Sequence, residues 1–91
     1  MRVVLEIPSG LARFASGQSS LELEGQTIED LFDRLWQVHP ELRSRILDEQ
    51  GQLYPYLAVI HNRERLTHKG LDRLKLQDGD TLEIMTLASG G

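Results

Sequence analysis

Three histidines, His39, His61 and His68, are the side chains of this sequence best suited to hold a metal ion. A zinc site brings its ligands together at short spacings such as HxH or HxxxH, often with cysteine. No such spacing joins these three histidines, and the sequence contains no Cys. We therefore expect ordinary surface histidines and no metal site.

Two other patterns resemble catalytic groups. Asp78 and Asp80 have the character of paired carboxylates for general acid–base chemistry. Gly79 between them favours a tight turn instead, in which both acids accept hydrogen bonds from nearby amides. Ser89 has no base close to it in sequence, so it is not expected to act as a nucleophile. We predict that the chain is not an enzyme.

The C-terminus ends in Ser89-Gly90-Gly91, preceded by Leu87 and Ala88. Two glycines add nothing to a core and lose much conformational entropy when ordered, so residues 87–91 are expected to form a flexible tail. The reactive group that such a tail offers is its main-chain carboxyl. By themselves, the two glycines indicate only a frayed terminus.

The remaining composition is that of one small acidic domain. The 91 residues include 10 Lys and Arg against 14 Asp and Glu, a net charge of −4. The acidic balance argues against nucleic acid or an anionic membrane as partner. No apolar run approaches the roughly 20 residues of a membrane span, and no signal peptide is recognisable. The absence of Cys fits a reducing compartment, so a cytoplasmic protein is expected.

Periodicity predicts the elements that present the tail. Apolar and polar residues alternate over 1–7 and 20–24, which favours an antiparallel hairpin joined by a loop at 11–17. Thr27 is a good N-cap for a helix that should stop near His39, because Pro40 disfavours helical geometry there. Trp36 is expected at the edge of its apolar stripe, and a short second helix follows Pro40.

The second half of the chain predicts further strands. Residues 57–60, 64–66 and 81–85 read as strands, with turns at 61–63 and 78–80. The predicted fold is therefore an α+β roll, a mixed sheet packed on one main helix, with the domain at 1–86 and the tail at 87–91. We expect Phe32→Ala to cost roughly 3–5 kcal/mol of stability. The predicted core consists of Val3, Leu5, Ile7, Leu21, Leu23, Ile28, Leu31, Phe32, Leu35, Val59, Leu82 and Ile84.

The closing segment carries a more specific pattern: Leu76-x-Asp78-Gly79-Asp80-x-Leu82-x-Ile84, a short spacer, and Gly90-Gly91. With the Thr-capped helix and the strand near Val59, it resembles the ubiquitin-like sulfur carriers typified by MoaD and ThiS. The chain is also similar to CysO-like and QbsE-like carriers. The spacer 85–87 lacks the proline that the family often has there, which leaves its stiffness open.

The resemblance implies a ubiquitin-like β-grasp fold and a specific chemistry. In this family, a partner adenylyltransferase uses ATP to adenylate the terminal carboxylate, here that of Gly91, and sulfur then displaces AMP. The resulting thiocarboxylate supplies a downstream synthase in molybdopterin, thiamin, cysteine or thiocarboxylate-metabolite synthesis. Gly90 and Ser89 would thread the partner's active site, and no cofactor would be bound by the carrier itself.

A tail ordered on binding costs affinity, so the folded body should also contact the activating enzyme. Leu87, Met85 and Leu57 are the candidates for an exposed apolar docking surface, and Tyr54 and Tyr56 for a further partner surface. Two alternatives stay open: a ubiquitin-like modifier conjugated to lysines, and a β-grasp interaction module whose terminus does not react.

Overall fold

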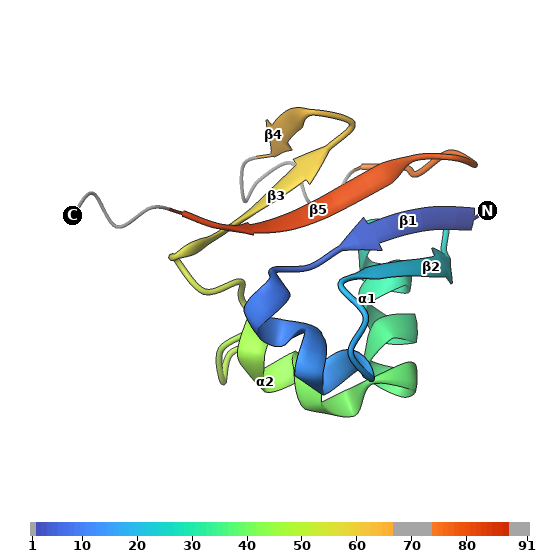
Figure 1. The fold of residues 1–91 in the computed structure, drawn as a ribbon. Coiled ribbons are helices and arrows are strands. Elements are labelled where there is room, and N and C mark those ends of the chain that lie inside the picture. The colour runs from blue at the N-terminus through green and yellow to red at the C-terminus, as the bar shows by residue number, and fades with distance from the viewer. Residues whose placement is uncertain (1, 67–73, 88–91) are drawn as a thin grey trace.

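The computed structural model describes residues 2–66 and 74–87. They form a five-stranded mixed sheet in the order β2-β1-β5-β3-β4, with the helices gathered on one face (Figure 1). β1 runs parallel to β5 and antiparallel to β2, and β3 runs antiparallel to both β4 and β5. The elements are β1 (Arg2–Glu6), the 3-10 helix η1 (Ser9–Ala15), β2 (Ser20–Glu24), α1 (Ile28–Val38), η2 (Pro40–Leu42), α2 (Arg43–Ile46), β3 (Leu57–His61), β4 (Glu64–Leu66) and β5 (Thr81–Thr86).

The main helix starts and ends as its sequence predicts. Thr27 Oγ1 accepts a hydrogen bond from the amide of Asp30 at 3.1 Å, which satisfies one of the free amides of the first turn. At the other end, the amide of His39 donates to Leu35 O at 2.7 Å, and Pro40 opens η2. The predicted short second helix is present as η2 and α2.

One predicted loop is a helix. Residues 11–17 belong largely to η1, which brings Ala15 into the core and packs Leu11 and Phe14 against it. The left-handed Ser16 and Gly17, at φ 56° and 81°, end this helix. A 3-10 helix this short has no sustained 3.6-residue apolar repeat, so its sequence resembles that of a loop.

The core lies between the sheet and α1, and it contains the predicted residues with one exception. Leu31 and Leu35 are fully buried, whereas Phe32 is partly buried and lies against Trp36 with ring centroids 5.4 Å apart and planes tilted by 38°. Phe32 is therefore mostly buried, as predicted, but it packs against the core from its margin and does not belong to it. The helix directs its Ile28–Leu31–Leu35 stripe at the sheet, which leaves Phe32 on the flank of that stripe, and Trp36 lies at the core edge as predicted.

No helix within residues 2–66 and 74–87 is long and apolar enough to cross a membrane.

Candidate functional site

The base of the tail is the end of a central strand. β5 lies between β1 and β3, and beyond its last residue the amide of Leu87 donates to Tyr56 O at 2.8 Å. The chain therefore leaves the sheet from an anchored position (Figure 1). Ser89, Gly90 and Gly91 lie outside the described residues, so their predicted roles remain predictions.

The three candidate docking residues do not share one face. Met85 is 41% exposed and lies opposite Ala58, on the sheet face away from α1. Leu87 is half-buried at the strand's end. Leu57, however, is only 4% exposed, so its prediction as an exposed docking residue is wrong.

The orientation of Leu57 follows from strand alternation. Leu57 and Val59 point to the same face of β3, and Val59 pairs with the buried Ile84 on the core side. The run Leu57-Ala58-Val59-Ile60 has no apolar–polar alternation, so its sequence could not indicate which residues faced outward.

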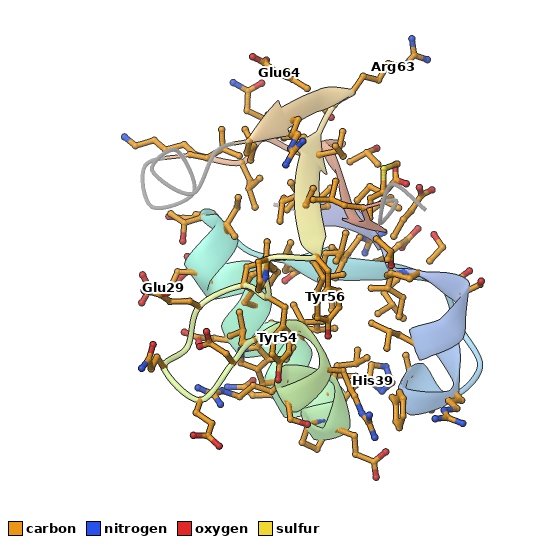
Figure 2. All side chains as sticks on the ribbon, turned by 90° about the vertical axis from the view of Figure 1, so that its left-hand side faces the viewer. Glu29, His39, Tyr54, Tyr56, Arg63 and Glu64 are labelled. Atoms are coloured by element: carbon orange, nitrogen blue, oxygen red, sulfur yellow. The ribbon has the colours of Figure 1, made fainter. Side chains whose placement is uncertain are left out.

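Two tyrosines stand beside the tail base. Tyr54 and Tyr56 stack with ring centroids 5.2 Å apart and planes tilted by 14°. The Tyr54 hydroxyl donates to Ser44 O at 2.9 Å, while Tyr56 is 52% exposed. Both lie near the start of β3, whereas Arg63 and Glu64 mark its far end (Figure 2). Tyr56 therefore offers an exposed aromatic ring next to the point where the tail begins.

The opposite end of β5 holds a polar cluster that the sequence did not predict. Asp80, 8% exposed, contacts His61 Nε2 at 2.8 Å and accepts from Asn62 Nδ2 at 3.0 Å. His61, with 18% of its side chain exposed, is thus not the ordinary surface histidine expected. The contacting residues are 18 and 19 positions apart in sequence, so no local motif reveals the cluster.

The predicted turn at 78–80 is confirmed and explains the acidic pair. Asp78 Oδ1 accepts from the amide of Arg2, and Asp80 Oδ2 from the amide of Gln77, each at 2.9 Å. Gly79 has φ 88°, which L side chains rarely adopt. Both carboxylates fix the entry to β5, so the geometry gives them a structural role.

The ionised form of Asp80 is stabilised by its contacts in this polar cluster. Burial by itself would raise the pKa of Asp80, but hydrogen bonds from Asn62, His61 and the Gln77 amide, and the charge of His61, lower it below 3.8. A lowered folded-state pKa stabilises the fold above the unfolded-state pKa, and this stabilisation is lost as pH falls through the folded pKa.

We therefore expect Asp80→Asn to reduce stability by about 1–3 kcal/mol at neutral pH, because the part-buried donors around it lose the carboxylate that accepts their hydrogen bonds. The loss should shrink as pH falls below about 4. Urea unfolding of both proteins across this pH range measures it, with the exposed Asp33→Asn as control. A loss that is the same at every pH would contradict a role for the ionised carboxylate.

Metal ligation has no geometric basis in the described part of the chain. Among residues 2–66 and 74–87, no three His, Asp or Glu side chains are placed to hold an ion. His68 lies outside those residues.

The sequence model of the ThiS family matches residues 6–91. The chain belongs to the ThiS family. A curated relative, the sulfur carrier protein CysO of Mycobacterium tuberculosis, is 26% identical over 93 residues, covering all of both chains.

Solved structures agree on the fold. A chain of the crystal structure of the Amycolatopsis orientalis BexX/CysO complex is 29% identical, with a TM-score of 0.84 and coverage of 98% of this chain and 99% of that one. The crystal structure of small archaeal modifier protein 1 from Haloferax volcanii is 28% identical, with a TM-score of 0.81 over the whole of both chains. The predicted ubiquitin-like β-grasp fold and the predicted family are confirmed for this ThiS-family chain.

Proposed function

We propose that this protein carries sulfur as a thiocarboxylate on the C-terminal carboxyl of Gly91. The observation that carries the proposal is the ThiS-family match, which extends through the final diglycine. The anchored exit of the chain at Leu87 supports it, because a fixed base limits where the following residues can reach. The chain itself contributes an acyl group, and its partners contribute the catalytic side chains.

The chemistry needs two steps at the Gly91 carboxyl group, the first through its oxygen and the second at its carbon. The Gly91 carboxylate attacks the α-phosphorus of ATP on the activating enzyme, which releases pyrophosphate and leaves an acyl-adenylate. A sulfide-level nucleophile then forms a C–S bond at the carbonyl carbon while the C–O bond to AMP breaks. The product is a thiocarboxylate, which donates its sulfur to a downstream synthase.

Intact-mass measurement tests the proposal. The protein is incubated with its activating enzyme, ATP and sulfide, and the expected product has one oxygen replaced by sulfur only when ATP is present. An unchanged mass would contradict the carrier function and favour a module with a non-reacting terminus.

A second candidate function is a protein modifier. The similarity to small archaeal modifier protein 1 of Haloferax volcanii favours it, since that protein is named as a modifier. The same incubation with a cell extract separates the two: amide-linked conjugates to lysine, found by peptide mapping, indicate the modifier.

We propose that the activating enzyme docks on the sheet face around Met85, next to Leu87 and Tyr56. Met85→Glu should lower kcat/KM for adenylation by about 10-fold, mainly through KM, because it places a charge in a desolvated contact. The matched control is Val38→Glu, since Val38 is 50% exposed but lies on α1 in the helical layer. Equal kinetics for both variants would place the docking surface elsewhere.

A further inference from the structure

A groove of about 810 Å³ crosses the helical side of the molecule, between α1 and the segment 47–55. Phe32 and Trp36 of α1 line it, together with Leu53 of the facing segment. Phe32 and Trp36 are partly buried against the core, and Leu53 belongs to it. The groove therefore presents an apolar surface that the chain's own fold leaves uncovered.

The outer wall of the groove is held by its own hydrogen bonds. Asp48 Oδ1 accepts from the amides of Gln50 and Gln52, each at 2.9 Å, and the amide of Asp48 donates to Gln52 O at 2.7 Å. Leu47 and Leu53 form an isolated antiparallel bridge at the ends of this turn. A wall fixed in this way loses little entropy when a ligand binds.

The charge around the groove is negative. Glu29, Asp33 and Asp48 line it, and Arg43 is the one cation among the lining residues that the structure describes. Figure 2 shows Glu29 projecting from α1 beside the 47–55 segment. Three carboxylates against one guanidinium favour a cationic ligand and disfavour an acidic one.

The groove and the tail base occupy different layers. The helices lie on one side of the sheet (Figure 1), with the core between α1 and the sheet. Met85 lies on the other face of the sheet, where it is 41% exposed. A ligand that covers Phe32 and Trp36 therefore leaves the outer sheet face around Met85 uncovered. One partner protein can occupy the groove while the terminal residues lie in the active site of another.

We propose that this groove binds a short segment of a partner protein that carries a large apolar side chain flanked by Lys or Arg. The apolar side chain covers Phe32 and Trp36, and the flanking cations face Glu29 and Asp33. The indole of Trp36 also attracts a nearby cation through its ring face. This interaction is independent of the chemical state of Gly91, and it stands whether or not the proposed sulfur transfer is correct.

The protein contains its own reporter for this site. Trp36 is the only tryptophan, so its fluorescence responds directly to a ligand in the groove. The probe is a capped octapeptide with Leu-Phe at its centre and Lys pairs on both sides; the control peptide has Glu in place of Lys. We expect saturable binding of the Lys peptide that weakens with added salt, and at least about 10-fold weaker binding of the Glu peptide.

Two double variants with the same change in net charge locate the binding. Glu29→Gln with Asp33→Asn removes charge from the groove, whereas Glu22→Gln with Glu24→Gln removes it from β2. All four residues are exposed, so both proteins should fold, which thermal unfolding checks. We expect about 5–10-fold weaker peptide binding for the groove variant and less than about 2-fold for the β2 variant.

Changes in amide NMR shifts on addition of the Lys peptide map the binding surface independently. We expect the largest changes in α1 and in residues 47–55. Equal loss of affinity in the two double variants would overturn the proposal, because it would indicate general attraction to an acidic protein. Shifts centred on another surface, equal binding of the Glu peptide, or no saturable binding would overturn it as well.

Discussion

Deletion of Gly91 is expected to abolish adenylation and thiocarboxylate formation while the fold remains unchanged. Leu87 is held by its hydrogen bond to Tyr56, so the four residues 88–91 set how far the carboxyl extends, about 13–14 Å at most. Removing one residue withdraws the carboxyl by about 3.3–3.6 Å. A misplacement of about 1 Å can already cost about 100-fold in rate, so the loss should exceed that. Single-turnover adenylation followed by intact mass measures it.

Matched variants separate this effect from a loss of folding. Addition of one Ala after Gly91 should be as damaging as deletion, because it displaces the carboxyl in the other direction. Gly90→Ala should react more slowly but not fail, since it adds one methyl and restricts the backbone. The thermal midpoint of all three should stay near that of the parent. Full activity without Gly91 would contradict the proposed carrier function and favour the non-reacting module.

Much of the fold follows from local sequence signals. Alternation predicted the β1–β2 hairpin, whose register pairs Val3 with Leu23 and Leu5 with Leu21. Thr27, Pro40 and Gly79 each mark a boundary for a steric or hydrogen-bonding reason that acts within a few residues, and each boundary is confirmed. Such signals need no knowledge of the partners across the core.

The errors arose where tertiary contacts decide the outcome. The burial of Leu57 depends on its pairing with β5, and the environment of His61 depends on Asp80, a residue that packs against it only after folding. Phe32 belongs to the apolar stripe by spacing, yet the direction in which α1 faces the sheet leaves it at the margin. Periodicity gives the width of a stripe but not its centre.

The same limit applies to the candidate sites. The terminal diglycine and the closing pattern led to the prediction that the chain reacts at its C-terminal carboxyl, and this stays a prediction because residues 88–91 lie outside the described residues. The helical groove was not predicted, because it forms only when 47–55 folds against Phe32 and Trp36. Phe32 packs against the core and also lines the groove. Stability measurements on variants of α1 therefore test where its side chain lies.

Leu31→Ala is expected to destabilise the protein by about 3–5 kcal/mol, because Leu31 is fully buried and its removal leaves a cavity. The neighbouring Phe32→Ala removes a larger side chain, yet it should cost only about 1–2 kcal/mol, less than the usual cost of a buried aromatic. Part of the Phe32 ring is already in water, the groove leaves no closed cavity, and alanine favours the helix.

Urea unfolding measures both variants, with the exposed Val38→Ala as a control that should lie within about 0.5 kcal/mol of the parent. The decisive result is a larger loss of stability for Leu31→Ala than for Phe32→Ala, since side-chain size alone would give the reverse order. A cost for Phe32→Ala equal to or above that for Leu31→Ala would mean that α1 is rotated toward Phe32 in solution. Such a rotation would bury the ring in the core and remove the apolar surface of the groove.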